Sequence, residues 1–353
     1  MNPATQVFFW CRGQDDNIGD AILRRRALRS LRTLGPVDLF VGGASSSFLS
    51  AMGIETTDRL EVSRVRWLLR LYAAGLRGDA LLAFNPGEVR PDRKAAMAHL
   101  SLIPYQLIGR LTGARSARLG VAIRGSGRLA MLPIRFSIRL TSLNTWRDTE
   151  TARRLPAGRA SCDWAFDEGP GPDGATGPRG VLAISYRGDR PPLSDRVVET
   201  LRLLSARTHL EPAVFVQARR DNEAARSLAS RLGCTLLPWQ DGDSHAEQEA
   251  QVRELLSRSR IVVSDRIHAL IVGVSEGAVP VAILDRPDQK IDRHMAPAGL
   301  GGRVLEIQDG EDPERLVDRI VALVDQTDLK AVRERAAAEL AEVTGQLRTV
   351  CFG

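Results

Sequence analysis

With 353 residues, the chain is too long for one ordinary hydrophobic core, so we expect two domains. Hydrophobic residues make up 43% and charged residues 26% of the composition, which is typical of a globular protein and excludes a disordered or fibrous one. Lysine and arginine number 49 against 43 acidic residues, and the net charge of +6 favours anionic ligands. The basic residues are scattered among acids, so we expect no nucleic-acid partner.

The four cysteines stand at positions 11, 162, 234 and 351, without the spacing of a metal site or of a disulfide framework. Such isolated thiols suit a reducing compartment. The opening residues lack the basic-then-apolar order of a signal peptide, and no run of about 18 apolar residues is present that would span a bilayer. We therefore expect a cytoplasmic protein.

The first half of the chain alternates short apolar runs with longer amphipathic stretches. The predicted strands are QVFFWC (6–11), VDLFVG (37–42), DALLAF (79–84) and SARLGVAI (116–123). The predicted helices cover residues 20–34 and 94–113. Alternation of this kind predicts a parallel sheet with helices on both faces.

A glycine- and proline-rich stretch, DEGPGPDGATGPRG (167–180), interrupts this rhythm, which then restarts. Predicted strands follow at 180–186, 212–217, 234–239, 260–265 and 279–284, with predicted helices at 194–208, 221–233, 247–259 and 267–277. We predict two Rossmann-like, doubly wound α/β domains that face a cleft, as in the GT-B architecture. The first covers residues 1–168 and the second 181–353, with a linker at 169–180 and the last helix packing back on the first domain.

Ligands of doubly wound sheets bind at the carboxyl ends of strands, beside helix N-termini, so the residues that follow strands are the site candidates. The first predicted strand is followed by Asn17, Gly19 and Asp20 at the head of a helix. We predict that they line the cleft, although an ordinary N-cap by Asn17 or Asp20 explains the pattern at least as well. The turn is neither a GxGxxG fingerprint nor a Walker loop, so no nucleotide cofactor is expected.

Two further candidates follow strands elsewhere in the chain. Arg147, in LNTWRDTET (143–151), either holds an anion from the cleft or forms an exposed pair with Asp148 on a loop. Gln217 ends a predicted strand of the second domain. Asp221, which follows it, is expected to cap the next helix.

The stretch SDRIHAL (264–270) places a serine, an aspartate, an arginine and a histidine at the end of an apolar strand. Ser264 suits the N-cap of the helix that follows, but capping does not require an arginine and a histidine within one turn. Arg266 can pair with an anion at this helix end, and His268 can exchange a proton near neutral pH. Lys290, one of three lysines, follows the next strand and would assist in binding the anion. No metal site is expected, because the carboxylates do not cluster.

Four segments of the chain resemble the polysaccharide pyruvyl transferase family. They are NIGDAIL (17–23), WRDTET (146–151), FVQARRDN (215–222) and SDRIHALIVGVSEGAVPVAI (264–283), the last followed by DRPDQK. The segments occur in the order of the family and are spread over most of the chain, between residues 17 and 290. The sequence departs from the family where a glycine-rich loop reads FNPGEV, and where threonine replaces the serine after the Arg–Asp pair.

The resemblance implies a transferase that moves a pyruvyl group from phosphoenolpyruvate to the hydroxyls of a polysaccharide or its precursor, forming a ketal and releasing phosphate. Phosphoenolpyruvate is then the donor substrate, no cofactor is needed, and the partner is a free or lipid-linked saccharide. The catalytic residues would be Arg266 and His268, the donor-binding residues Arg147, Ser264, Arg266 and Lys290, and the residues on the acceptor side of the cleft Asn17, Gly19, Asp20 and Gln217.

Other functions stay open at this point. A GT-B glycosyltransferase would use the same architecture for a nucleotide-sugar donor, and a saccharide-binding protein would keep the fold without the chemistry. The stretch SRVRWLLRLYAAGLRG (63–78) either covers the sheet or lies as a basic amphipathic helix on the inner face of the cell membrane. The sequence does not indicate the acceptor sugar, the choice between ketal and enol ether, or the oligomeric state.

Overall fold

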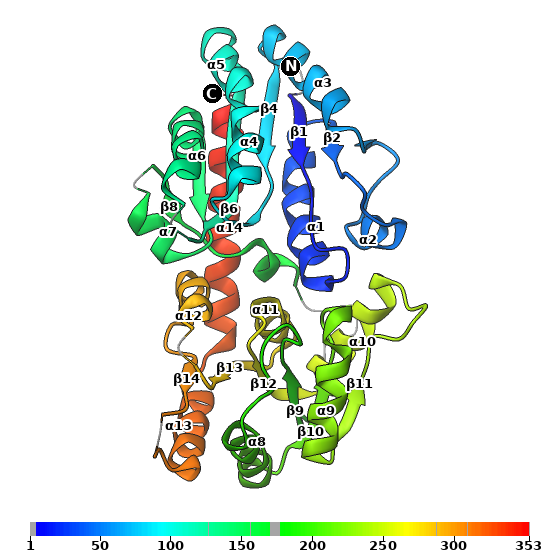
Figure 1. Cartoon of the computed structure of the whole chain (residues 1–353), viewed down its shortest axis with the longest axis vertical. Helices are drawn as coiled ribbons and strands as arrows, with labels where there is room; N and C mark the ends of the chain where they lie inside the picture. The colour runs from blue at the N-terminus through cyan, green and yellow to red at the C-terminus, as the bar shows by residue number, and fades with distance from the viewer. Residues whose placement is uncertain are drawn as a thin grey trace. The chain divides into compact units, whose positions relative to one another are not determined.

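The computed structural model of the chain describes residues 5–125, 127–155, 157–169, 177–286, 288–308 and 310–352 (Figure 1). The chain divides into two compact units. The first unit consists of Met1–Gly13, Leu23–Trp164 and Ala338–Gly353, and the second of Gln14–Ile22 and Ala165–Ala337. Most of the predicted linker, residues 170–176, lies outside the described part of the chain.

The first unit is built on a sheet of eight strands in the order β3-β2-β1-β4-β6-β7-β8, with β5 paired to β6. Neighbouring strands are parallel throughout. Strands at the centre of the sheet are buried along their length, which is why they read as continuous apolar runs. The strands are β1 (Gln6–Trp10), β2 (Val37–Phe40), β3 (Arg59–Glu61), β4 (Ala80–Phe84), β5 (Gly87–Val89), β6 (Arg115–Ile123), β7 (Leu143–Trp146) and β8 (Arg159–Ala160).

Among the described residues, six helices lie wholly in the first unit, and α1 and α14 each pass from one unit to the other along the chain. The single helix predicted at residues 94–113 is two helices, α4 and α5. Pro104, at the start of α5, has no backbone N–H to continue the ladder of α4, and its ring would clash with the carbonyl of Leu100. The helices are α1 (Ile18–Arg32), α2 (Ser46–Ala51), α3 (Arg64–Arg77), α4 (Arg93–Leu100), α5 (Ile103–Thr112), α6 (Arg128–Leu140), α7 (Thr149–Arg154) and α14 (Leu329–Phe352).

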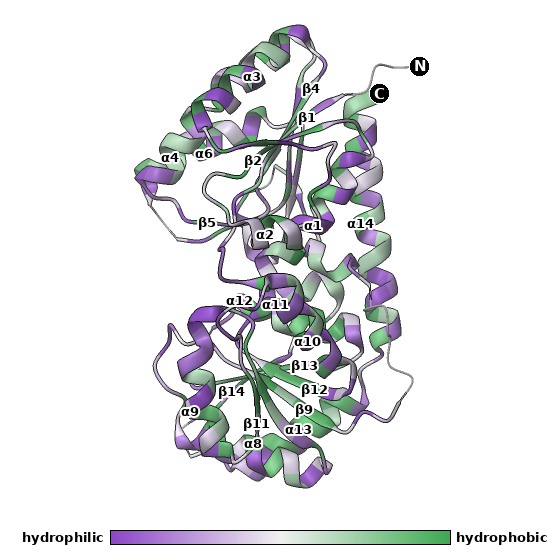
Figure 2. Cartoon of the chain, turned by 90° about the vertical axis from the view of Figure 1, so that its right-hand side faces the viewer, coloured by the Kyte–Doolittle hydropathy of each residue, from purple (hydrophilic) through white to green (hydrophobic). Residues whose placement is uncertain are grey.

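The second unit is built on a parallel sheet of six strands in the order β11-β10-β9-β12-β13-β14. Its strands β9, β12 and β13 are hydrophobic, as Figure 2 shows. The strands are β9 (Val181–Ser185), β10 (Glu211–Phe215), β11 (Thr235–Leu237), β12 (Ser259–Ser264), β13 (Val279–Leu284) and β14 (Val304–Glu306). The helices are α8 (Asp195–Thr208), α9 (Asn222–Leu232), α10 (His245–Ser257), α11 (Ile267–Glu276), α12 (Lys290–Met295) and α13 (Pro313–Asp325).

Each sheet is doubly wound, so the predicted fold class is confirmed. In the first sheet, β2 and β3 lie on one side of β1, and the strands from β4 onward lie on its other side. In the second sheet, β10 and β11 lie on one side of β9, and the strands from β12 onward lie on its other side. The switch points therefore lie between β1 and β4 and between β9 and β12, and such points are where these sheets bind ligands. The division along the chain differs from the predicted one at Gln14–Ile22, which groups with the second unit. Ala338–Gly353, the end of the last helix, groups with the first unit.

Candidate functional site

The switch point of the second sheet brings the ends of β9 and β12 side by side. The two strands end at Ser185 and Ser264, which are partners in the register of the sheet. Ser264 Oγ donates to the carbonyl of Ser185 and accepts a hydrogen bond of 2.9 Å from the backbone N–H of Arg266. The hydroxyl thus fixes the turn that leads from β12 into α11, which begins at Ile267.

Arg266 is buried at this turn, and its guanidinium forms a two-point ion pair with Asp221. Its Nη2 donates to Asp221 Oδ1 over 2.6 Å, and its Nε donates to Oδ2. The backbone N–H of Gly188 donates to the same Oδ1 over 2.8 Å. The expectation that Asp221 caps α9 is wrong, because its side chain makes no capping bond. A carboxylate buried beside a guanidinium is stabilised most by that charged partner.

The pairing of Asp221 with Arg266 is the feature of the site that sequence reasoning missed. The two residues are 45 positions apart, and the signal available in the sequence was that each follows a predicted strand. The ion pair holds the guanidinium of Arg266 in one orientation. The Nη1 atom of Arg266 makes no hydrogen bond with a described residue, so this nitrogen can donate to a ligand.

The segment around Asn17 is hydrogen-bonded to the end of β10, within the second unit. Asn17 Oδ1 accepts from Gln217 Nε2 (2.9 Å) and from the backbone N–H of Gly19 (3.0 Å). The backbone N–H of Ile18 donates to the carbonyl of Gln217 (3.2 Å), and Asn17 forms an antiparallel bridge with Ala218. Asn17 therefore closes the first turn of α1, as an N-cap would, and also holds that turn against the second sheet.

Gly19 lies directly against His268, in the first turn of α11. A Cβ atom at position 19 would come within 2.5 Å of His268 Cβ, 2.6 Å of His268 Nδ1 and 2.6 Å of Gln217 Nε2. The imidazole is buried with 5% of the residue exposed. The Oε1 atom of Gln217 is buried beside it and has no hydrogen-bond partner among the described residues. The amide oxygen of Gln217 is therefore available for a polar contact with a ligand, next to the buried imidazole of His268.

We call these residues the switch-point cluster: Asn17, Gly19, Gln217, Asp221, Ser264, Arg266 and His268. All of them belong to the second unit. Four of the predicted site residues thus come together through hydrogen bonds or direct packing: Asn17, Gly19, Gln217 and His268. Ser264 and Arg266 lie in the turn that leads into α11, the helix that contains His268. Asn17 and Gly19, predicted on the side of the first domain, therefore group with the residues predicted to bind the donor.

Asp265 ties the loop after β9 to the same turn. Its Oδ1 accepts from the backbone N–H of Arg187 (2.8 Å), and its Oδ2 lies 3.4 Å from Nη1 of Arg190. Burial raises the pKa of the Asp265 carboxyl, and the charge of Arg190 opposes part of that rise. The carboxylate of Asp265 thus holds Arg187 and Arg190 in place beside the cluster.

Asp20 and Lys290 make hydrogen bonds within their own turns. Asp20 Oδ2 accepts from the backbone N–H of Gln14 (2.7 Å), closing the turn before α1. Lys290 is the first residue of α12, and its backbone N–H donates to Asp288 Oδ1 over 2.9 Å. A role for either side chain in ligand binding stays a prediction.

Arg147 belongs to the first unit and is buried, with 4% of the residue exposed. Its Nη1 donates to Asp163 Oδ2 over 3.0 Å. Asp148 instead caps α7, where it accepts from the backbone N–H (2.7 Å) and the hydroxyl (2.6 Å) of Thr151. The alternative of an exposed Arg147–Asp148 pair is therefore wrong. A donor site that uses Arg147 together with Arg266 stays a prediction.

A pocket of about 710 Å³ opens beside the switch-point cluster, within the second unit. It lies between the loop after β9, the loop after β13 and helix α9, and it includes Asp265. Five arginines line it: Arg187, Arg190, Arg220, Arg231 and Arg286. Four of them pair with aspartates, in the pairs Arg187–Asp189, Arg190–Asp288, Arg220–Asp16 and Arg231–Asp195. Arg286 has no ion-pair partner among the described residues, so this lining suits an anionic ligand.

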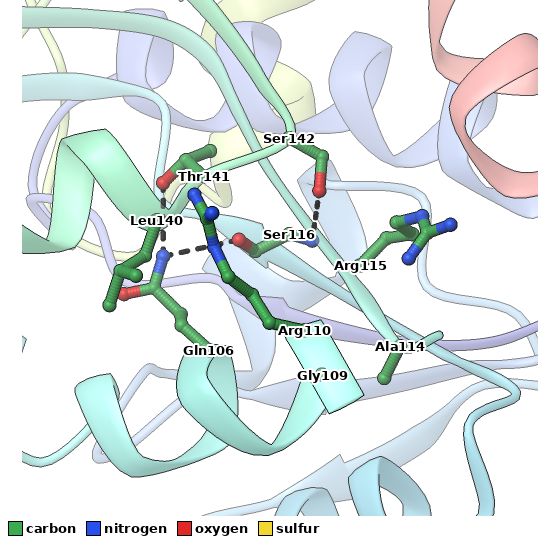
Figure 3. Close-up of a pocket in the computed structure, with 9 residues that line it drawn as sticks. All are labelled: Gln106, Gly109, Arg110, Ala114, Arg115, Ser116, Leu140, Thr141 and Ser142. Atoms are coloured by element: carbon green, nitrogen blue, oxygen red, sulfur yellow. Dashed lines mark hydrogen bonds between the residues drawn. The ribbon is translucent and has the colours of Figure 1, made fainter. Parts of the chain in front are cut away.

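A smaller pocket, of about 280 Å³, lies in the first unit between α5, the start of β6 and the turn after α6 (Figure 3). In Figure 3 the side chain of Gln106 points toward Thr141 and Ser116, and its Nε2 donates to their hydroxyls over 3.0 and 3.1 Å. Both residues stand at the amino ends of strands, the edge opposite to the one that binds ligands in such sheets. We therefore assign this network to the packing of α5 and α6.

Neither a cluster of metal-binding side chains nor a membrane-spanning helix is found among the described residues. They contain no group of three or more histidine, cysteine, aspartate or glutamate side chains that is placed to hold a metal ion. Within the same residues, none of the helices combines the length and the apolar character that crossing a bilayer requires.

A comparison with protein-family models finds no match to this chain, and a sequence comparison with curated proteins finds none. Solved structures do match it over nearly the whole length. One is the UDP-GlcNAc 2-epimerase from Methanocaldococcus jannaschii, with a TM-score of 0.57 and 7% identity over 99% of this chain and 100% of that one. Another is the Neisseria meningitidis UDP-GlcNAc 2-epimerase bound to UDP-GlcNAc, with a TM-score of 0.55 and 11% identity over 97% and 100%.

A third is the Anabaena protein HepE in complex with UDP and glucose, with a TM-score of 0.54 and 13% identity over 98% of this chain and 97% of that one. Identities this low show the fold and nothing more specific. The two doubly wound sheets and these matches together show that the chain has a GT-B-like fold.

Proposed function

We propose that the chain is a transferase that moves a pyruvyl group from phosphoenolpyruvate to the hydroxyls of a saccharide. The observation that carries the proposal is the switch-point cluster. Three of the four segments that resemble pyruvyl transferases contribute to it, with Asn17, Gln217 and His268, and Asn17 lies 200 positions from Gln217. Residues that are distant in sequence meet where a doubly wound sheet binds its ligand.

Arg266 suits the binding of the donor's anionic groups. Its Nε and Nη2 are engaged by Asp221, which leaves Nη1 to donate to a phosphate or carboxylate oxygen. Because the ion pair fixes the guanidinium before a ligand arrives, little rotamer entropy is lost on binding. Arg147 would hold the donor's second anionic group, as the resemblance implies.

His268 suits the proton transfers of the reaction. As an imidazolium it gives a proton to the methylene carbon of phosphoenolpyruvate, and the π electrons of the C=C bond form the new C–H bond. Positive charge then develops at the central carbon, where the oxygen of a sugar hydroxyl forms a C–O bond and loses its proton to the imidazole. The bond from the central carbon to the phosphate oxygen breaks, and a second sugar hydroxyl closes the ketal as its proton leaves with the phosphate.

A second candidate is an enzyme that acts on a nucleotide sugar. The arginine-lined pocket favours it, because about 710 Å³ is room for a ligand larger than phosphoenolpyruvate. The solved structures that match the chain include two UDP-GlcNAc 2-epimerases and a complex with UDP and glucose, and they agree with this candidate better than with the first. At 7–13% identity they support it through the fold alone.

Calorimetric titration with phosphoenolpyruvate, UDP and UDP-GlcNAc separates the candidates. We expect the unmodified protein to bind phosphoenolpyruvate and, with a panel of oligosaccharide acceptors, to release inorganic phosphate. His268→Asn should keep donor affinity and lower phosphate release by about 100- to 10,000-fold, the usual range for loss of an acid–base group. Arg286→Ala, a matched change in the arginine-lined pocket, should leave both unchanged.

The opposite pattern supports the second candidate. Binding of UDP-GlcNAc that Arg286→Ala weakens, together with no heat from phosphoenolpyruvate, would remove pyruvyl transfer. An absence of binding by all three compounds, without any protection from thermal unfolding, would contradict both candidates.

A further inference from the structure

Four helices of the first unit, α3, α4, α5 and α6, pack against one another and form what we call the helical face. Helix α3 packs on α5, α5 on α6, and α4 on both α5 and α6. Hydrogen bonds join them: Arg64 Nη2 of α3 donates to Ser101 Oγ at the end of α4 (2.6 Å), and Arg110 Nη2 of α5 donates to the carbonyl of Arg139 in α6 (2.8 Å). The helical face is therefore one continuous, braced surface.

Large apolar side chains point outward from all four helices. In α3, Trp67 and Leu71 are buried on one side, while Val65, Leu69 and Leu76 form a second apolar stripe on the other side, each more than 60% exposed. Helices α6, α5 and α4 also have large apolar side chains exposed on the side away from the core. The exposed residues there are Leu129, Leu132 and Phe136 in α6, Leu107 and Leu111 in α5, and Met97 and Leu100 in α4. A core explains only the buried stripes, and exposed apolar stripes rimmed by polar residues are typical of an interaction surface.

Three of these helices share an apolar groove of about 690 Å³. It is lined by residues of α4, the start of α5 and α6, among them Leu100, Ile103, Leu132 and Phe136. Arg93 is the one charged residue in its lining. Four of the exposed apolar side chains are thus neighbours around a common hollow: Leu100, Leu129, Leu132 and Phe136.

Charge is distributed just as unevenly over the helical face. Its four helices carry ten basic residues and no acidic residue, in a chain that has 43 acidic residues in total. Six of the ten are exposed and form no ion pair with a described residue: Arg93, Lys94, Arg110, Arg128, Arg135 and Arg139. In α6, Arg128, Arg135 and Arg139 flank the stripe of Leu129, Leu132 and Phe136.

We infer that the helical face docks on an anionic lipid bilayer. Leucine and phenylalanine side chains would enter the boundary between headgroups and acyl chains, while the arginines and Lys94 meet lipid phosphates. A second copy of the chain is a poorer occupant, because a symmetric contact would set the same uncompensated positive charges against each other. The inference concerns the first unit and does not depend on the reaction proposed above.

Flotation of the protein with lipid vesicles tests the inference. We expect binding to phosphatidylcholine vesicles that contain phosphatidylglycerol, much weaker binding to phosphatidylcholine alone, and loss of binding as salt is raised, because salt screens surface charge. The triple variant Arg93→Glu, Arg135→Glu, Arg139→Glu should bind anionic vesicles at least about 100-fold more weakly, since each basic residue near such a surface contributes a factor of about five. Its matched control reverses three exposed arginines outside the helical face, Arg226, Arg315 and Arg348, and should bind as the unmodified protein does.

A second triple variant tests whether the exposed apolar side chains contribute to vesicle binding. Leu129→Ser, Leu132→Ser, Phe136→Ser keeps every charge and should also lose vesicle binding, whereas Phe352→Ser, at an exposed apolar position of α14, should not. The inference is overturned if both triple variants float as well as the unmodified protein. It is overturned as well if the unmodified protein does not bind anionic vesicles. If that protein then sediments as a dimer that the serine variant makes monomeric, the occupant of the helical face is a second copy.

Discussion

Gly19→Ala probes the closest contact of the switch-point cluster. The new Cβ would lie 2.5 Å from His268 Cβ and 2.6 Å from Gln217 Nε2, and separations below 3.0 Å force something to move. His268 Cβ is fixed to the backbone of α11, so the imidazole cannot simply swing aside. The first turn of α1 or that of α11 must shift instead, and the hydrogen bond of Gln217 to Asn17 must lengthen.

Two effects of opposite sign set the change in stability. Overpacking of this kind costs about 1–3 kcal/mol, and an alanine in place of a helical glycine stabilises by about 1 kcal/mol or less. We expect the clash to win and the free energy of unfolding of the second unit to fall by about 1–2 kcal/mol. The control is Gly345→Ala in α14, where nothing lies within 4 Å of the new Cβ, and it should stabilise by about 0.5–1 kcal/mol.

Urea unfolding followed by circular dichroism and tryptophan fluorescence measures both variants. The side-chain NMR resonances of His268, assigned by their loss in His268→Asn, should shift in Gly19→Ala and stay in place in Gly345→Ala. If Gly19→Ala raised the unfolding midpoint as the control does and left those resonances unmoved, the packing of α1 on α11 would be refuted.

The remaining predictions concern charge and protonation. Asp221→Asn should lower the free energy of unfolding by about 3–5 kcal/mol in urea denaturation, because it leaves the guanidinium of Arg266 buried without its carboxylate, and Asp221→Asn with Arg266→Met should recover at least half of that loss. Burial, with repulsion from Arg118, lowers the pKa of His99 to about 3. The neutral form of His99 therefore contributes stability that is complete above its unfolded pKa of about 6.5 and is lost as pH falls toward 3. His99→Leu should flatten the fall of the urea midpoint between about pH 6.5 and pH 4, and an unchanged slope would contradict this pKa shift. Burial raises the pKa of Cys11 to about 12, so mass spectrometry after alkylation at about pH 8 should find this thiol unmodified in the native protein and modified in denaturant.

The fold was largely predictable from the sequence because parallel sheets are buried on both faces. Stretches such as VPVAIL and DALLAF have no polar side of their own, and they became β13 and β4. Helix positions followed from the amphipathic stretches between them. The break between α4 and α5 was also within reach, since Pro104 interrupts the apolar pattern.

The site was predictable in its residues more than in its contacts. Position after a strand identified Asn17, Gln217 and His268, because strand ends of one sheet lie at one edge. The assignment of Asp221 to a helix cap failed because a cap is a local bond, whereas the arginine that holds this carboxylate comes from another loop. Pairings between loops depend on the order of strands in the sheet, and the sequence contains that order only indirectly.

The two units are each assembled from separated stretches of chain, and this has a practical consequence for dissecting the protein. A fragment that starts at residue 181 would leave behind Asn17 and Gly19, so its β10 and α11 would lose the short segment packed on them. The same fragment would contain Leu340, Val343 and Leu347, which belong to the first unit and are fully buried in the intact chain. The fragment would therefore separate these three side chains from the unit in which they pack. Cutting between the sheets therefore damages both halves, and chimeras with related proteins must exchange the N-terminal loop and the C-terminal helix together with the sheet each one completes.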